Sequence, residues 1–249
     1  MDFARLFSGN LTSGGGGGDP GDPIGQSLRF RSDSSRFLRS NSPTSSEIST
    51  WTYSVWLKVE GTAGSTTGWK PTVFADAPIG GNPQNATQIR FDTYNATGRN
   101  WVFDVYGPGG SLIDGGSGHP VSHADPSAWY HFVYSYDGTT FRIYTNGKLD
   151  FSKNQVCTFG NNKDLQVGAS NAAPYNFRGY MASAHFVDGQ ALDPTTFGRF
   201  NANDVWVPVK PDLSPATVSR LSDFLTAENG FKEDSAINGG AHYAFAMRS

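Results

Sequence analysis

The sequence predicts an all-β protein built as a two-sheet antiparallel sandwich or jelly roll. Glycine occurs 30 times in 249 residues, aromatic residues make up 14% and charged residues only 16%. This composition is typical of turn-rich β proteins, because helices favour Ala, Leu, Glu and Lys. Short segments with strand-like alternation recur along most of the chain with turn signals between them. We therefore expect one large β domain.

The composition divides the chain into three parts. Residues 1–25 hold a short apolar-faced peptide, followed by five consecutive glycines and further Gly and Pro residues that act as a tether. Residues 26–207 hold the strand-like segments and are expected to form the jelly roll. Residues 208–249 form a C-terminal extension, with an extended linker, a helix expected over 215–229 and a terminal strand in HYAFAM.

The expected strands share period-two alternation or a short apolar run between turn residues. In chain order they are SLRF (27–30), RFLR (36–39), WTYSVWLK (51–58), TVFADA (72–77), QIRFDTY (88–94), NWVFDVYG (100–107), LQVGAS (165–170) and GYMASAHFVDGQAL (179–192). Segments 88–94 and 100–107 flank NATGR and are expected to pair as a hairpin.

The segment WYHFVYSYDGTTFRIYTNGKLD (129–150) is expected to be the central hairpin. Phe132, Tyr134 and Tyr136 alternate with smaller residues, and Phe141 and Ile143 do the same on the second strand. The dipeptides Asp-Gly and Asn-Gly tolerate the positive φ of tight turns. The segment therefore has a sufficient structural role as scaffold.

Three blocks in this order resemble a known family. The blocks WTYSVWLK, the 129–150 hairpin, and LQVGAS with FRGYMASAHFVDGQAL are similar to the strand signatures of the laminin-G-like, concanavalin A-like lectin jelly-roll family, over about residues 27–200. The resemblance implies a concanavalin A-like jelly roll with a short N-terminal arm and a C-terminal extension.

A second, narrower resemblance lies in AHFVDGQALDPTTFGRF (184–200) with VWVPVKP (205–211). It looks like a segment of the laminin-G-like structural proteins of tailed bacteriophages, and SLRFRSDSSRFLRS and AHYAFAM are similar to their first and last strands. This resemblance implies a virion component, either a capsid decoration or a tail or fibre protein. It would be assembled in the host cytoplasm, present in many copies or as a homo-oligomer, and bound to other virion proteins. The alternative is a stand-alone carbohydrate-binding lectin or adhesion module.

The charge and hydropathy of the sequence exclude some classes of binding partner. The formal net charge of −3 provides no broad basic field, so we expect no nucleic-acid partner. No apolar run approaches 18 residues, and the first residues lack the basic and apolar pattern of a signal peptide, so neither membrane insertion nor a secretion signal is expected. The single cysteine, Cys157, cannot form an internal disulfide.

The residues expected of a jelly-roll glucanase are missing, so we expect no enzyme. A retaining glycosidase needs two carboxylates facing each other on one strand face. The four glutamates fall in turns, strand ends or the tail: Glu47, Glu60, Glu228 and Glu233. Asp92 and Asp104 remain as the residual pair. No G-x-S-x-G sequence accompanies the five histidines.

Three sets of residues are candidates for binding. An apolar face of the N-terminal peptide would anchor the chain to a partner, unless this terminus is only a local packing arm: Phe3, Leu6, Phe7 and Leu11. Loop aromatics and amides would hold a host-surface glycan: Trp69, Asn85, Asn95 and Trp101. No cofactor is expected; calcium is the alternative, at carboxylates near loop ends: Asp76, Asp114, Asp125 and Asp188.

Overall fold

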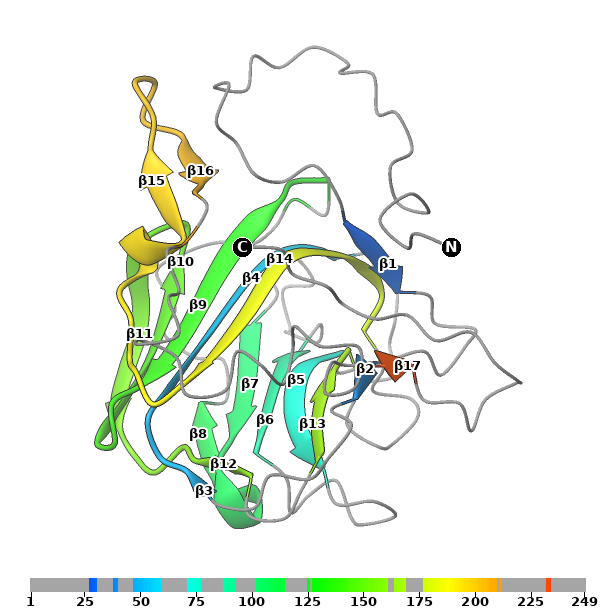
Figure 1. Ribbon diagram of the computed structural model, residues 1–249, viewed down its shortest axis with the longest axis vertical. Helices are drawn as coiled ribbons and strands as arrows, with labels where there is room; N and C mark the ends of the chain where they lie inside the picture. Colours follow the sequence, from blue (N-terminus) through cyan, green and yellow to red (C-terminus); the bar gives the residue numbers. More distant parts are fainter. Residues whose placement is uncertain are drawn as a thin grey trace.

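The computed structural model describes residues 27–30, 38–39, 47–59, 71–77, 87–92, 102–114, 125, 127–160, 164–168, 177–209, 211 and 232–233. The strands of these segments form two large antiparallel sheets and two short strand pairs (Figure 1). No helix within these segments is long and apolar enough to cross a membrane. The helix expected at 215–229 and the strand HYAFAM lie outside the described residues.

The first large sheet has six strands in the order β1-β14-β4-β9-β10-β11. Their bounds are β1 Leu28–Phe30, β4 Trp51–Val59, β9 Tyr130–Tyr136, β10 Thr140–Thr145, β11 Lys148–Asn154 and β14 Gly179–Asp188. All neighbours are antiparallel. The N-terminal strand therefore lies beside the last long strand of the sandwich.

The second large sheet has seven strands in the order β17-β2-β13-β5-β6-β7-β8. Their bounds are β2 Leu38–Arg39, β5 Thr72–Ala77, β6 Gln88–Asp92, β7 Val102–Tyr106, β8 Leu112–Asp114, β13 Asp164–Val167 and β17 Lys232–Glu233. The hairpin expected from segments 88–94 and 100–107 is present as β6 and β7. Strand β17 comes from the 208–249 extension, so this extension contributes an edge strand to the jelly roll.

Four short elements complete the described chain. They are β3 Glu47–Ile48 paired with β12 Phe159–Gly160, β15 Gly198–Phe200 paired with β16 Trp206–Pro208, and the 3-10 turns η3 Pro108–Gly110 and η4 Pro194–Thr196.

The two large sheets pack face to face around an aromatic core. Tyr53 of β4 stacks on Phe74 of β5 with ring centroids 4.4 Å apart, and Trp51 meets Phe159 edge to face. The indole of Trp51 donates to the carbonyl of Cys157 at 2.6 Å, and the Cys157 thiol is buried and free. The all-β jelly-roll prediction is confirmed. Burying each such side chain contributes about 1.5–3 kcal/mol before the entropy of ordering is subtracted.

The 129–150 segment forms a three-stranded meander, β9-β10-β11, rather than a single hairpin. Phe132, Tyr134 and Phe141 point into the core, as the alternation predicts. The Asn146-Gly147 turn, with φ of 47° and 77°, joins β10 to β11. Two positive φ values in succession suit the right-handed twist of a hairpin, which explains the Asn-Gly sequence.

The side of the sandwich is closed where the last strands of the two sheets meet. The ammonium group of Lys153, on β11, donates to the Ile113 carbonyl of β8 at 2.9 Å. Gln155, just beyond β11, donates to the neighbouring Leu112 carbonyl at 3.3 Å. These side chains occupy backbone acceptors of an edge strand that would otherwise be open to another chain.

Candidate binding surface

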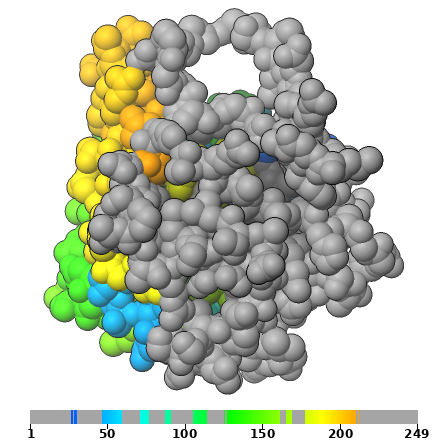
Figure 2. Space-filling model, viewed as in Figure 1, coloured from blue at the N-terminus to red at the C-terminus, as the bar shows by residue number. Residues whose placement is uncertain are grey.

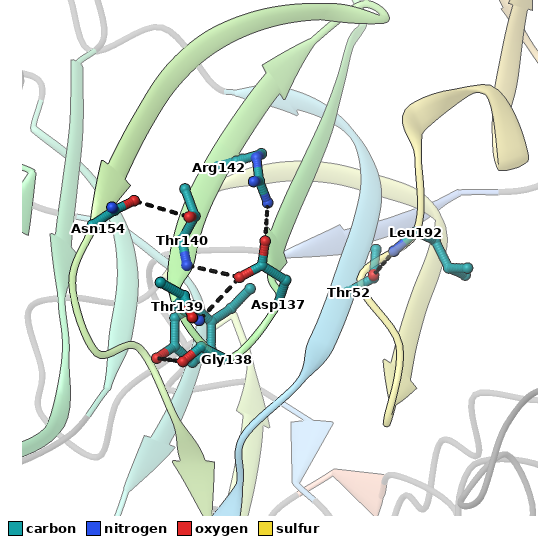
Figure 3. Close-up of polar contacts among 9 residues, drawn as sticks. Thr52, Asp137, Gly138, Thr139, Thr140, Arg142, Asn154 and Leu192 are labelled. Carbon is teal, nitrogen blue, oxygen red and sulfur yellow. Dashed lines mark hydrogen bonds and ion pairs between the residues drawn. The ribbon is translucent and has the colours of Figure 1, made fainter.

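The outer face of the six-stranded sheet is partly covered by residues 189–208, which we call the cover segment. It contains η4 and the β15–β16 hairpin, which extends past the end of β10 in Figure 1 and forms the yellow-to-orange surface in Figure 2. The hydroxyl of Thr52, on β4, donates to the Gln190 carbonyl at 2.8 Å. It also accepts from the Leu192 N–H at 2.7 Å (Figure 3). This side chain fixes the start of the cover segment.

The cover segment explains why both faces of β4 are buried, whereas strict alternation would leave one face in water. Phe197 packs with Val133 and Val187 on the outer face. Trp206 packs with Trp56 and Ala182 farther along it. The outward positions of β4 are therefore a second, smaller core rather than a solvated surface.

His131 is the buried polar centre under the cover segment. Its ring stacks on that of Trp56 with centroids 4.9 Å apart, and the Trp206 ring is nearly parallel to it with centroids 6.0 Å apart. The Trp206 indole N–H donates to Nδ1 at 2.9 Å, and Nε2 lies 2.8 Å from Ser54 Oγ. Burial lowers the pKa of His131 to about 3, so the ring is neutral at pH 7.

These contacts fix the histidine tautomer. An indole nitrogen can only donate a hydrogen bond, so Nδ1 must accept and the proton of the neutral ring lies on Nε2. Nε2 then donates to Ser54, and it has no lone pair with which to take the serine proton. The Ser54–His131 pair resembles a nucleophile and its base in distance alone, and it cannot perform that chemistry in this geometry.

His185 is a second histidine of the outer face. It follows a bulge in β14 at which Ser183 has a φ of 46°, and the Ser183 hydroxyl lies 3.1 Å from its Nε2. Its ring stacks on Phe197 of the cover segment. Burial lowers its pKa to about 4. Both strand histidines therefore support the cover segment.

One row of outward side chains continues beyond the cover segment. Antiparallel register places Arg29 of β1 opposite Tyr180 of β14, and Tyr180 opposite Lys58 of β4. Because Leu57 pairs with Tyr130, Lys58 faces Trp129, the residue that precedes β9. Directly opposite residues share a sheet face. We call Arg29, Tyr180, Lys58 and Trp129 the outer row.

The side chains of the outer row form an aromatic and cationic surface. Trp129 is 36% exposed, and its ring lies 6.5 Å from that of Tyr180 across β4. The guanidinium of Arg29, which is exposed, lies 5.7 Å from the centroid of the Tyr180 ring. Both Lys58 and Tyr180 are half-buried. Exposed aromatic faces with charged groups beside them are typical of ligand-binding surfaces.

Asp125 lies beside this row. Its carboxylate accepts from the N–H and hydroxyl of Ser127 at 2.8 and 2.6 Å, and its own N–H donates to the Tyr130 hydroxyl at 3.3 Å. The Ser127 contacts, with a smaller effect of Lys58, lower the pKa of Asp125. The loop that leads into Trp129 is thus held by its own hydrogen bonds.

The residues proposed from the sequence as glycan ligands, Trp69, Asn85, Asn95 and Trp101, lie outside the described residues. The same holds for the proposed anchor: Phe3, Leu6, Phe7 and Leu11. Both sets therefore stay predictions. The outer row was not predicted as a set, although the sequence places Arg29 close to three further arginines, Arg31, Arg36 and Arg39. The alternation of side chains does indicate it: Lys58 and Trp129 are next in sequence to Leu57 and Tyr130, which point into the core, so they must point outward.

The structure does not bring the calcium candidates together. Asp76 is buried, and its two oxygens accept from the N–H groups of Thr87 and Gly160 at 2.7 and 2.9 Å. Asp125 lies near Lys58, and Asp188 pairs with Trp51 at the other end of β4. Trp51 and Lys58 are seven positions apart on β4, so Asp188 and Asp125 lie near points of this strand that are about 23 Å apart.

The other two candidates lie in the seven-stranded sheet. Asp114 is the last residue of β8, and Asp76 is close to the end of β5. Within the described segments, no three His, Cys, Asp or Glu residues form a group that could hold a metal ion.

Two antiparallel sheets around one aromatic core, with a partly covered outer face, define a jelly-roll sandwich. The family described as the concanavalin A-like lectin/glucanases superfamily matches residues 32–196, and the chain belongs to this superfamily. A comparison with curated proteins gives no match.

Two solved structures with similar folds illustrate the architecture. The heptameric pentraxin of Limulus polyphemus has a TM-score of 0.51 and 14% identity, over 71% of this chain and 80% of that one. Domain 4 of the extracellular arabinanase AbnA of Geobacillus stearothermophilus, solved with arabinotriose, has a TM-score of 0.51 and 20% identity, over 72% and 79%. At this identity the likeness concerns the fold.

Proposed function

We propose that this chain is a non-enzymatic, carbohydrate-binding module of the lectin type, with the outer row as its binding surface. The observation that carries the proposal is the exposed Trp129 ring beside Tyr180, on the part of the sheet beyond the cover segment. A flat indole can pack against the apolar C–H face of a sugar while charged neighbours bond its hydroxyl groups. Tyr180 lies on strand β14 and Trp129 directly precedes strand β9, so the sheet holds both rings in place.

Two structural observations support the absence of catalysis. The Ser54–His131 pair has the wrong tautomer for a general base. Glu47 and Glu233, the glutamates among the described residues, lie in different sheets, on β3 and β17. A paired-carboxylate glycosidase would need both groups on one face.

Asp92 and Asp104 remain the residual pair for an enzyme. The register does place them on one face of the neighbouring strands β6 and β7, because Asp104 lies opposite Arg90.

A glycan array probed with the purified chain tests the proposal, with arabinotriose among the probes because the similar arabinanase domain was solved with it. We expect binding of at least one glycan, with loss on Trp129→Ala. Phe200→Ala is the matched control, because Phe200 is an exposed aromatic residue on the β15–β16 hairpin and does not belong to the outer row. The proposal is wrong if no glycan binds, or if both variants bind as the native chain does.

The sequence supports a second candidate, a structural protein of a tailed-phage particle that displays this module. Its support is the resemblance of segments 184–200 and 205–211, which contain most of the cover segment. Phe3, Leu6, Phe7 and Leu11 would anchor the chain to capsid or tail proteins, and many copies would bind host glycans by avidity. Deleting residues 2–12 should abolish incorporation into particles and leave glycan binding intact; unchanged incorporation excludes the anchor.

A further inference from the structure

We infer that the outer row selects a saccharide that carries a carboxylate, such as a uronic or sialic acid. The inference rests on the proposed carbohydrate-binding function and adds the class of sugar. Two of the four residues of the row are cations, Arg29 and Lys58, and each stands next to an aromatic ring in the register of the sheet. A neutral sugar would need only the rings and neutral hydrogen-bonding groups.

Arg29 is positioned to bind an anion. Its guanidinium lies over the Tyr180 ring, a contact that restricts the side chain, and Arg29 remains exposed. A planar guanidinium can donate two parallel hydrogen bonds to a carboxylate, and stacking on an aromatic ring leaves its edges available for this. The restricted side chain also loses less freedom when it binds.

Lys58 adds the second positive charge between the two rings. It lies on β4, the strand over which Trp129 and Tyr180 approach each other. Asp125 is the acidic neighbour, and the Ser127 hydrogen bonds lower its pKa and keep it ionised, so it offsets one of the two positive charges. Among these described residues, two cations against one carboxylate leave an excess of positive charge that favours an anionic ligand.

The spacing of the row suits an oligosaccharide. Arg29 and Trp129 lie on the first and fourth positions of the order β1-β14-β4-β9, so three strand spacings of about 4.8 Å separate them. The backbone positions are thus on the order of 14 Å apart. The side chains approach more closely, because the Tyr180 ring lies 6.5 Å from the Trp129 ring and 5.7 Å from the Arg29 guanidinium, so a ligand that stacks on Trp129 and reaches Arg29 spans at most about 12 Å. The upper end of this span exceeds one sugar ring, so an oligosaccharide can place the carboxylate and the stacked ring in different residues.

Calorimetry with matched sugars tests the inference. One pair is trigalacturonic acid and its carboxyl-reduced form, which differ only in their carboxylates; the other is sialyllactose and lactose. We expect the acidic member of at least one pair to bind about tenfold more tightly, with an advantage that shrinks at high salt. The pair that responds distinguishes uronic from sialic acid.

Variants separate the charge from the ring. Arg29→Gln with Lys58→Gln should remove the acidic preference and keep the binding of neutral sugar, whereas Trp129→Ala should weaken both. Lys148→Gln, which removes an exposed positive charge from β11, is the control and should change neither. Equal binding of acidic and neutral sugars, lost on Trp129→Ala, overturns the inference and leaves the lectin function standing. Absence of Trp129-dependent binding of any sugar overturns both.

Discussion

At the scale of the residue, His131 shows that environment rather than residue type decides chemistry. A histidine 2.8 Å from a serine hydroxyl suggests nucleophilic catalysis until the other ring nitrogen is considered. The Trp206 N–H occupies that nitrogen, and both partners are buried. The pair therefore stabilises the packing of the cover segment, and this role follows from hydrogen-bond direction alone.

The depressed pKa of His131 makes stability depend on pH. The folded ring titrates at about 3, whereas in the unfolded chain it titrates near its ordinary 6.5. Between these values the unfolded chain binds a proton that the folded chain does not, so the free energy of unfolding falls as pH decreases, by up to about 1.4 kcal/mol per pH unit. Urea unfolding at pH 4.5–7.5 measures this slope.

The substitution His131→Gln should give a shallower slope over the same pH range, with lower stability at pH 7 because the Trp206 and Ser54 contacts change. A slope identical to that of the native chain would show that His131 is not the titrating group. His185, whose pKa is about 4, should account for part of the remaining slope.

The grouping of individual side chains into a site was the feature that the sequence predicted least well. The outer row combines residues from β1, β4, β14 and the loop before β9, and their registers join segments up to 151 positions apart, as Arg29 and Tyr180 are. Local alternation predicts which way each side chain points, and it does not predict which strand lies alongside. The pairing of Ser54 with His131 was hidden for the same reason.

At the scale of the element, the turn between β9 and β10 depends on one carboxylate. Asp137 accepts from the N–H groups of Thr139 and Thr140 at 2.9 and 2.8 Å and from Arg142 at 2.7 Å (Figure 3). Gly138, with a φ of 92°, provides the conformation that the tight turn requires. Sequence chemistry predicted this turn well, because Asp-Gly encodes both the acceptor and the positive φ.

Substitutions at Asp137 should separate backbone bonding from charge. Asp137→Ala removes all three contacts and should lower the free energy of unfolding by about 1–2 kcal/mol. Asp137→Asn keeps an acceptor oxygen and should cost about half as much. The control Arg142→Ala removes only the exposed ion pair and should cost under about 0.5 kcal/mol. Chemical denaturation measures the three; a larger loss for Arg142→Ala than for Asp137→Ala would contradict this ranking.

The stability of this turn also depends on pH, but the cause is a hydrogen-bonded carboxylate rather than a buried histidine. The Thr140 N–H and, next, Arg142 lower the pKa of Asp137 to about 2. Its stabilising effect is therefore complete above the ordinary carboxyl pKa of 3.8 and is lost as pH falls towards 2. Measurements above pH 4.5 thus report on the histidines without interference from Asp137.

At the scale of the whole molecule, two segments from late in the sequence, the cover segment and β17, complete the sandwich by packing on or pairing with earlier strands. The long strands were predictable because their alternation and turn residues are local, as in Trp51–Val59. The burial of both faces of this strand was not predictable, because it depends on the cover segment, more than 130 residues later in the chain. The pairing of β17 with β2 is likewise a long-range contact that local patterns cannot indicate.

Trp206 is the main attachment of the cover segment, and its removal should separate the cover from the sandwich. The indole is only 8% exposed and donates to His131, and a Cβ on Gly147 or Gly198 would collide with its ring. Trp206→Ala should therefore lower the free energy of unfolding by about 3–5 kcal/mol. Limited proteolysis should then cut within residues 189–208 before the sandwich itself is cleaved.

The matched control for this experiment is Phe200→Ala on the same hairpin. Phe200 packs against Trp206 edge to face but is 45% exposed, so its loss should cost under about 1 kcal/mol. Simultaneous cleavage of cover and sandwich in Trp206→Ala would mean that they unfold as one cooperative unit rather than as a core with a detachable cover. Similar losses for both variants would contradict the role of Trp206 as the main attachment of the cover segment.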